Sequence, residues 1–441
     1  MRRLLMLSAI ILLVQTGFAQ TFNKAKMDSL MDAISANNRA MICVAIRQSG
    51  ELLYSRAIGY SNIDATNKTP ATTQTRYRIG SISKVFTSVI IFQLIEEGKL
   101  TFATPLAKFF PELPNADKIT IAQMLNHSSG LHNFTNDSTY TNMNTKPVTH
   151  VEMLLKFRNQ KPDFEPGTKN AYSNTNFVLL GYIAEKLDKK PYAEILKTRI
   201  TNKIGLKDTY YGGKINPANQ EAKSYTWDGD WKPATETDMS IPGGAGALVS
   251  TPTDLTKFMD ALFTGKLISD SSLVHLKTQK GGFGMDLIAI PFYGRTGYGH
   301  NGGIDGFLSH ASYFSIGKVA VSYTTNGSNL NLNDVLIAML SIAFNQSYTI
   351  PDFKMPSLKT EDLDKYLGIY ASGQLPLKIT ITKNGTQLVA QATGQPAFPL
   401  DATAVNEFKF NAAGVVLLFD PAKNQMTLKQ GGGSFLFTKE K

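Results

Sequence analysis

A serine and a lysine stand three residues apart, as Ser81 and Lys84, in the segment YRIGSISK at residues 77–84. On a helix this spacing places the hydroxyl and the amine on one face, within reach of one another. A serine hydroxyl becomes a good nucleophile when a neighbour takes its proton, and a lysine can take it near neutral pH when burial lowers the lysine pKa. The pair therefore predicts a nucleophile with its base.

The segment that follows Ser81 has the pattern of a buried helix, with Gly98 as a plausible stop. Its apolar residues cover nearly the whole circumference: Ile82, Val85, Phe86, Val89, Ile90, Phe92, Leu94 and Ile95. We expect this helix inside the protein, where apolar surroundings lower a lysine pKa.

A Ser-x-x-Lys match alone is weak, because about two are expected by chance in a chain of this length. The second match, Ser315 to Lys318, contains Gly317 and lies between alternating β-formers, which predicts a hairpin turn at the surface. For the first match, an ordinary helix start with a solvated lysine remains the alternative. Other polar groups must decide between these interpretations.

Tyr172 and Asn174 follow a Pro-Gly turn at 166–167 and precede a periodic helical segment that ends near Leu187. A phenol is a second group that can carry a proton. The alternative is that Tyr172 packs in the core and Asn174 caps the helix.

Two glycine-rich stretches come later in the chain. No Gly-Lys-Ser or Gly-Lys-Thr follows the first, at 243–246, so it indicates close backbone packing rather than a phosphate loop. The second, GHNGGIDGF at 299–307, places His300 at a strand edge ahead of strands predicted at 311–314 and 319–325.

Neither metal nor cofactor chemistry is favoured by the remaining candidates. His127 and His132 lack the Glu and the helical spacing of a zinc protease site, and no third ligand is apparent. Cys43 is the one cysteine, and its apolar neighbours indicate a core thiol rather than a nucleophile. We therefore expect no metal and no cofactor.

Composition indicates a globular protein with a core large enough for a main domain and a smaller second one, because 42% of its 441 residues are hydrophobic. The net charge is +10, but the lysines are scattered rather than clustered. Nucleic-acid binding is therefore not expected.

The first residues resemble a secretory signal. Arg2 and Arg3 precede an apolar run from Leu4 to Val14, and small residues ending at Ala19 supply a cleavage site. The run is too short to span a bilayer. We expect a signal peptide at 1–19, a periplasmic or secreted protein, and no stable membrane span after its removal.

The rest of the chain divides into three parts. Residues 20–347 begin with a helix at 22–36 and a β-hairpin at 41–58, and contain all the candidate groups. Residues 348–362 contain two prolines and mixed polar residues and are predicted as a linker. Short β-like runs separated by turns then predict a small antiparallel barrel-like domain at 363–441.

Taken together, four motifs in this order resemble the serine β-lactamase and penicillin-binding protein superfamily, in its branch of class C enzymes, D-alanyl-D-alanine carboxypeptidases and esterases. They are RIGSISK at 78–84, PGT at 166–168 with YSN at 172–174, GAGALVSTPTDL at 244–255, and GHNGGIDGF at 299–307. The resemblance covers about residues 25–345. It implies an α+β fold, in which an antiparallel sheet flanked by helices and a helical subdomain border a cleft headed by Ser81.

The resemblance also implies a role for each matching residue. Ser81 would form an acyl-enzyme, with Lys84 and Tyr172 sharing the proton transfers and nearby cations favouring the Tyr172 phenolate. The backbone N–H groups of Ser81 and Gly303 would form the oxyanion hole. Substrate would be held by Asn174, His300 and Gly302.

His300 is a departure, because many members have Lys-Thr-Gly where this chain has His-Asn-Gly at 300–302. The change disfavours strong β-lactamase activity. We expect an exported serine hydrolase of a small-molecule or peptide substrate, of the D-amino-acid peptide, ester or lactam type, with peptidoglycan fragments among the candidates. The alternatives are a cell-wall-binding or sensing protein with little turnover, and a class C-like β-lactamase.

Overall fold

The structure is a computed structural model. It describes residues 22–440, except 65, 229, 280–283, 351–357, 411–412 and 431–432. The signal peptide predicted at 1–19 lies outside the described residues.

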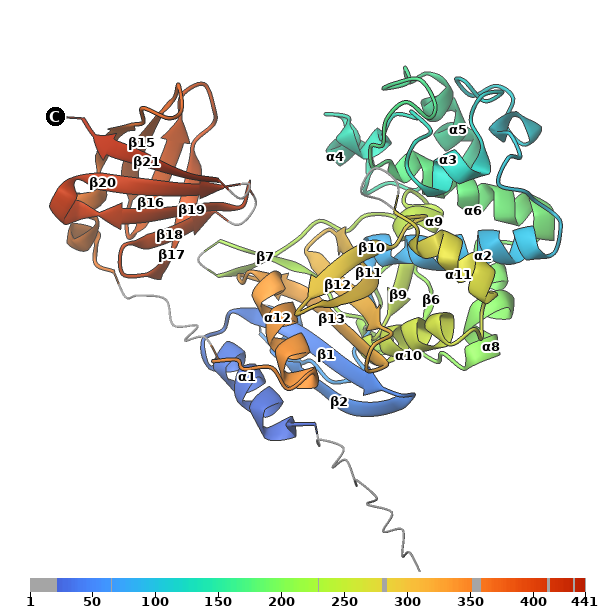
Figure 1. Cartoon of the computed structure of the whole chain (residues 1–441), viewed down its shortest axis with the longest axis horizontal. Helices are drawn as coiled ribbons and strands as arrows, with labels where there is room; N and C mark the ends of the chain where they lie inside the picture. Colours follow the sequence, from blue (N-terminus) through green and yellow to red (C-terminus); the bar gives the residue numbers. More distant parts are fainter. Residues whose placement is uncertain are drawn as a thin grey trace, which may run out of the picture.

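A six-stranded antiparallel sheet forms the centre of the larger region (Figure 1). Its order is β10 (Ile288–Phe292), β11 (Arg295–Ile304), β12 (Phe307–Phe314), β13 (Val319–Ser328), β1 (Ala40–Gln48) and β2 (Glu51–Ile58). The predicted hairpin is β1 and β2, and the turn predicted at 315–318 connects β12 to β13. Residues 40–46 of β1 are all buried, which explains why the strand is a continuous apolar run instead of an alternating one.

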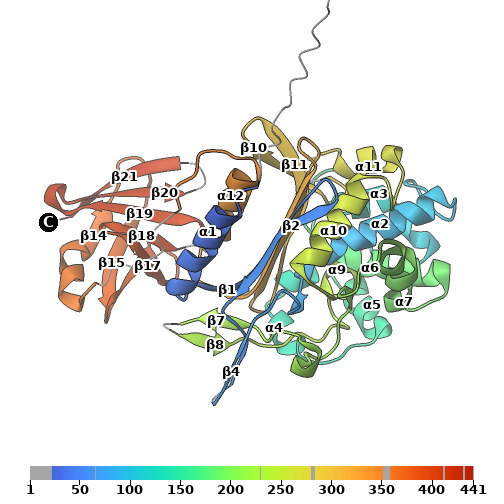
Figure 2. The same ribbon diagram turned by 90° about the horizontal axis from the view of Figure 1, so that it is seen from below.

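Helices cover both faces of this sheet (Figure 2). On one face α1 (Lys24–Ala36) packs against α12 (Leu332–Ala343), and on the other α10 (Pro252–Phe263) packs against β1, β12 and β13. The helix predicted at 22–36 is therefore confirmed as α1, with Asn23 as its N-cap.

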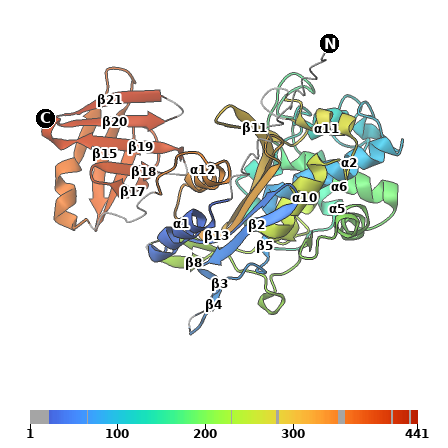
Figure 3. The same ribbon diagram turned by 60° about the horizontal axis from the view of Figure 1, so that its bottom comes forward.

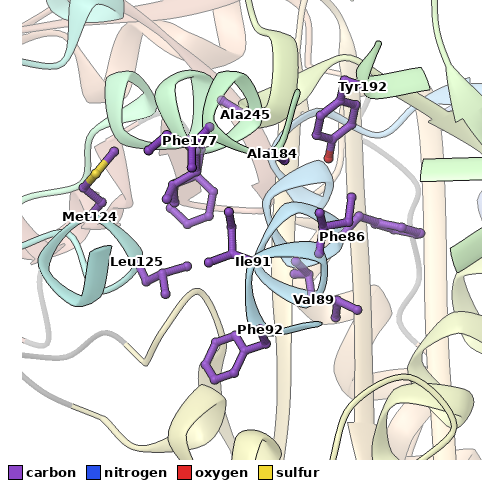
Figure 4. Close-up of a cluster of buried hydrophobic side chains, with 14 of the residues drawn as sticks. Phe86, Val89, Ile91, Phe92, Met124, Leu125, Phe177, Ala184, Tyr192 and Ala245 are labelled. Atoms are coloured by element: carbon purple, nitrogen blue, oxygen red, sulfur yellow. The ribbon is translucent and has the colours of Figure 1, made fainter. Parts of the chain in front are cut away.

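The predicted buried helix is α2 (Ser83–Glu96), in which the side chains from Ser83 to Leu94 are all buried. Figure 4 shows residues of α2 packed with Phe177 of α6 (Asn174–Asp188) and Leu125 of α3 (Ile121–Leu125). Other short elements complete this helical part: α4 (Tyr140–Met143), α5 (His150–Arg158), α7 (Tyr192–Leu196), α8 (Asn202–Ile204), α9 (Gly243–Gly246) and α11 (Asp270–Lys277).

Gly244 and Gly246 serve close packing, as predicted, whereas Gly243 has a positive φ of +43°. A Cβ built on Gly244 would lie 2.7 Å from the carbonyl oxygen of Phe177, so α9 lies directly on α6. Short strands connect the helical part to the sheet: β3 (Tyr60–Ile63), β4 (Lys68–Pro70), β5 (Tyr77–Arg78), β6 (Tyr210–Tyr211), β7 (Tyr225–Trp227), β8 (Trp231–Pro233) and β9 (Leu248–Ser250). The pairing of β5 with β9 fixes the backbone just before Ser81.

The C-terminal region is a closed antiparallel barrel, as predicted, and lies beyond α12 on the side of the sheet away from α2 (Figure 3). Its strands are β14 (Gly368–Ala371), β15 (Lys378–Asn384), β16 (Gln387–Ala392), β17 (Phe398–Ala404), β18 (Glu407–Phe410), β19 (Val415–Asp420), β20 (Gln425–Gln430) and β21 (Gly433–Lys439). A 3₁₀ helix at Thr360–Tyr366 adds Leu363 and Tyr366 to the barrel core. Leu358, which lies inside the predicted linker, also packs against this core.

Candidate active site

Ser81 lies in a 3₁₀ turn, Gly80–Ile82, directly before α2, so the helix begins two residues after it. Gly80 has a φ of +49°, and a Cβ there would lie 2.8 Å from the backbone nitrogen of Gly303. Only glycine satisfies both conditions without strain. This contact brings the backbone of β11 against the turn that carries Ser81.

Lys84 and Tyr172 both reach the Ser81 hydroxyl. Lys84 Nζ lies 2.9 Å from Ser81 Oγ and donates to the carbonyl oxygen of Ala245 at 2.7 Å. The Tyr172 hydroxyl donates to Ser81 Oγ at 2.7 Å. The three predicted catalytic groups are therefore brought together from two helices and the segment before α6.

Burial shifts the pKa values of Lys84 and Tyr172 and so determines their protonation states. It lowers the pKa of Lys84 to about 7, although the nearby Asp286 carboxyl opposes the shift. A neutral amine keeps a lone pair for the Ser81 proton and has two N–H donors, one of which bonds the Ala245 carbonyl. Burial also raises the pKa of Tyr172, so the expectation that cations favour its phenolate is wrong. Of these two groups, Lys84 is the one whose pKa lies near neutral pH, and burial favours the neutral phenol form of Tyr172.

A cavity of about 270 Å³ opens in front of Ser81. Its lining includes the two predicted oxyanion-hole residues, Ser81 and Gly303, together with Asn174. The Asn174 amide donates to Asn133 and Thr135, which fixes its orientation at the cavity wall. The other lining residues are Gly80, Phe134, Thr135, Tyr140, Asn144, Thr235, Thr237, Pro242, Ala245, Gly246, Ile304 and Asp305.

Asp305 is the one charged residue among the described residues that line this cavity, and it is already paired. Its carboxylate contacts the Arg78 guanidinium at 3.0 Å, and it accepts from the Thr237 hydroxyl at 2.6 Å. The side chains of Arg78 and Asp305 are 2% and 1% exposed. This buried ion pair stabilises the wall and leaves no free charge for a substrate.

His300 and Gly302, which were predicted to hold substrate, lie on β11 beside this cavity and not in its lining. His300 is buried, and burial with the nearby Lys84 charge lowers its pKa to about 4. A Cβ on Gly302 would lie 2.0 Å from the carbonyl oxygen of Ile79. His300 is therefore neutral at physiological pH, and Gly302 packs against the backbone that precedes Ser81.

The two histidines that were considered as metal ligands point in different directions. His132 contacts Asp163 and Asp137 near the surface, at 2.7 and 3.1 Å. His127 is buried, and its ring centroid lies 4.6 Å from that of Tyr172. In the described part of the chain, no cluster of three or more His, Cys, Asp or Glu side chains has metal-binding geometry.

Cys43 is buried in β1, and burial raises the pKa of its thiol to about 12, as expected for a core residue rather than a nucleophile. Sequence reasoning missed three contributors to the site: the Ala245 carbonyl, the ring of His127 next to Tyr172, and Asp286. Asp286 carried no recognisable signal, because it lies in no motif and reaches the site only through the fold.

A serine bonded to a buried lysine and a tyrosine, beside a small cavity, defines a serine hydrolase. Comparison with known proteins agrees, because a sequence model of the Beta-lactamase family matches residues 25–343. The chain belongs to this family. It is accordingly a serine hydrolase.

Three relatives illustrate the similarity. Penicillin-binding protein 4* of Bacillus subtilis (strain 168) is 27% identical over 93% of this chain and 97% of its own length. Teichoic acid D-alanine hydrolase of Staphylococcus aureus is 27% identical over 51% of this chain and 55% of its own length. The crystal structure of D-amino acid amidase from Ochrobactrum anthropi SV3, complexed with L-phenylalanine amide, has 27% identity and a TM-score of 0.65, covering 73% of this chain and 98% of that one.

Within the residues that the structure describes, no helix combines the length and apolar character needed to cross a bilayer.

Proposed function

We propose that the protein is an exported acyl hydrolase that forms an acyl-enzyme on Ser81 and prefers uncharged amides and esters of D-amino acids. The observation that supports this most strongly is the double contact of Ser81 Oγ with a lysine of lowered pKa and a neutral phenol. The D-amino-acid preference rests on the names of two relatives, a D-amino acid amidase and a teichoic acid D-alanine hydrolase.

In the proposed reaction, Ser81 Oγ bonds to the substrate carbonyl carbon while its proton passes to the neutral amine of Lys84. The carbonyl oxygen takes the electron pair and is stabilised by the backbone N–H groups of Ser81 and Gly303. The C–N or C–O bond then breaks, and the leaving group takes a proton through the Tyr172 hydroxyl. Water attacks the resulting ester with the same groups, which releases the acid and restores Ser81.

The preference for uncharged substrates follows from the cavity. No Lys, Arg or His is among its described lining residues, and its one carboxylate is neutralised by Arg78. His300, at the position where many members have lysine, is neutral above pH about 4. A free substrate carboxylate would thus lose hydration without gaining a cation, which is costly.

The test is hydrolysis by the purified protein of D-alanine amide, a short-chain aryl ester, a chromogenic cephalosporin, and D-alanyl-D-alanine beside its C-terminal amide. We expect turnover of the first two, and a preference of at least about tenfold for the dipeptide amide over the dipeptide acid, about 1.4 kcal/mol. A preference for the acid would contradict the substrate class. Acylation by every compound without product release would favour a binding or sensing protein, and fast cephalosporin hydrolysis would favour a β-lactamase.

The matched dipeptides also test His300. Because a neutral imidazole does not change charge between pH 5 and 8, KM for the acid and the amide should change in parallel over that range. Binding to Ser81→Ala protein is the control, since KM equals a dissociation constant only when chemistry is slow. A selective loss of affinity for the acid with rising pH that is absent in His300→Gln would show a cationic His300, whereas the same loss in both proteins would assign it to Lys84.

Export rests on the sequence of residues 1–19. We expect the mature protein to begin at Gln20, which N-terminal sequencing of protein from the native host would detect. Retention of Met1 in the mature protein would contradict export.

A further inference from the structure

Asp286 lies just before β10 and is fully buried beside the catalytic groups. Neither oxygen of its carboxyl has a hydrogen-bond partner among the described residues. Its backbone φ is +86°, a conformation that is unfavourable for a residue with a side chain. A buried, unsatisfied carboxyl on a strained backbone destabilises the fold, so its presence points to function.

Two histidines face this carboxyl. Asp286 Oδ1 lies 3.5 Å from Nε2 of His300 and 3.9 Å from Nε2 of His127. His300 comes from β11, and His127 comes from the turn after α3.

The partners of the other ring nitrogens assign the protons. His127 Nδ1 accepts from the backbone N–H of Ser173 at 3.2 Å, so in the neutral ring the proton is on Nε2 and faces Asp286. His300 Nδ1 lies 2.5 Å from the carbonyl oxygen of Asn301, which can only accept, so Nδ1 carries the proton. Its Nε2 then presents a lone pair to Asp286.

If Asp286 were ionised, its carboxylate oxygen and the lone pair of His300 Nε2 would face each other as two hydrogen-bond acceptors. A proton held by either atom would instead form a hydrogen bond between them. We propose that Asp286 is a positioning residue whose buried carboxyl shares one proton with His300 and so fixes the His300 ring beside Ser81. The inference rests on the proposed function, because it gives His300 a place next to the acyl-transfer centre.

The surroundings agree with a shared proton. Lys84 of α2 and Tyr172 before α6 also interact electrostatically with Asp286, and His310 of β12 interacts electrostatically with His300. Burial raises the pKa of Asp286 well above its ordinary value, while Lys84 acts in the opposite direction. Burial lowers the pKa values of His127 and His310 as well, so neither competes for the proton at neutral pH.

The test compares Asp286→Asn with Asp286→Gly. The Asn amide can donate to His300 and accept from His127 without titrating. Glycine removes the carboxyl and suits the positive φ, which keeps that variant folded. Asp254→Asn is the control, because Asp254 is another buried carboxyl but bonds Thr209 and the Asp208 backbone.

The measurement is the rate of covalent labelling by a fluorophosphonate from pH 5 to 10. We expect Asp286→Asn to keep the plateau rate within about threefold and to move the alkaline limb upward by about one pH unit or more, because the group that ionises is gone. Asp286→Gly should lower the plateau about 10 to 100-fold, as loss of an outer partner does for metal-bound histidines. Asp254→Asn should leave the pH profile unchanged.

If Asp286→Asn and Asp286→Gly lost the labelling rate equally, and the acidic and alkaline limbs of the pH profile stayed unchanged, the proposal would be overturned in favour of a structural role. A downward shift of the acidic limb in Asp286→Asn would overturn it in favour of a counter-ion for Lys84. Wild-type protein that is not labelled on Ser81 would overturn the proposed function, and this inference with it. The two failures are therefore distinguishable.

Discussion

The described residues of the barrel core are apolar or aromatic, whereas the region around Ser81 buries lysine, histidine, aspartate and arginine. In the described part of the barrel, no charged, amide or aliphatic hydroxyl side chain is buried. The catalytic region buries Lys84, Asp286 and three histidines close together, and Arg78 with Asp305 nearby. Buried charge costs stability unless it is well paired, so a fold retains it where chemistry requires it. The contrast indicates that the barrel serves stability or docking, and that the chemistry is in the larger region.

The largest expected effect is on activity. Lys84→Met should lower kcat about 1,000-fold or more, the range of general-base catalysis, while the free energy of unfolding stays equal or rises because a buried amine is removed. Lys383→Met in the barrel is the matched control, since this lysine bonds Asp364 and should leave kcat unchanged. If Lys84→Met kept its kcat but lost stability, the buried charge near Ser81 would serve stability rather than chemistry, which would contradict the contrast between the two regions.

The second effect is on stability against acid. All six histidines lie between residues 127 and 310, and burial lowers the pKa of His310 to about 3 and that of His127 well below its ordinary value. The unfolded chain then binds more protons, so stability is fully present above pH about 6.5 and falls with pH by about 1.4 kcal/mol per unit for each such histidine. Asp286 and His300 together hold one proton in both states over pH 4 to 6.5, so they contribute little.

Tryptophan fluorescence can measure this effect, because both tryptophans, Trp227 and Trp231, lie in the larger region. Urea unfolding followed by this signal should show a midpoint that falls below pH 6.5, and less steeply in His310→Gln. If the urea midpoint fell equally steeply with pH in His310→Gln and in the parent protein, the acid sensitivity would belong to other groups.

The third effect concerns packing beside Ser81. Gly302→Ala should destabilise the protein by about 1 to 3 kcal/mol, because its Cβ would overlap the carbonyl oxygen of Ile79, 2.0 Å away. Gly303→Ala is the neighbouring control, since its Cβ would meet nothing nearer than Leu308 at 3.5 Å. Equal unfolding free energies for the two variants would show that β11 can move away from the 3₁₀ turn.

The smallest effect is expected from removal of the barrel. Because none of the described barrel residues lines the cavity at Ser81, a chain that ends at Ile350 should keep kcat/KM within about threefold and unfold in one cooperative step. The aryl ester assay measures kcat/KM, and calorimetry measures the cooperativity of unfolding. A truncated protein without a cooperative transition would show that the barrel is part of the catalytic core and that the proposed domain boundary is wrong.

Short-range patterns made much of this structure predictable. The apolar periodicity after Ser81 predicted α2, alternating β-formers predicted the hairpins and the barrel, and four ordered motifs predicted the fold. The same motifs identified Ser81, Lys84 and Tyr172 as catalytic candidates from the sequence alone. Each of these signals is local and depends on residue type and spacing.

What could not be predicted depends on burial and on distant contacts. The charge of Tyr172 was misjudged, because nearby cations are visible in a sequence while exclusion of water is not. The sequence disfavoured a metal pair of His127 and His132 but could not place either ring, which depends on the turn that begins at the φ of +58° at His127. Asp286 gave no signal, because folding alone places it between two histidines.

The most direct test of the account is the site of acylation. Wild-type protein mixed with the aryl ester and quenched within milliseconds should gain the mass of the acyl group, and digestion should place it on Ser81. Ser81→Ala protein should gain no mass and hydrolyse nothing above background. An acyl group on any other residue, or hydrolysis that persists in Ser81→Ala, would contradict the account.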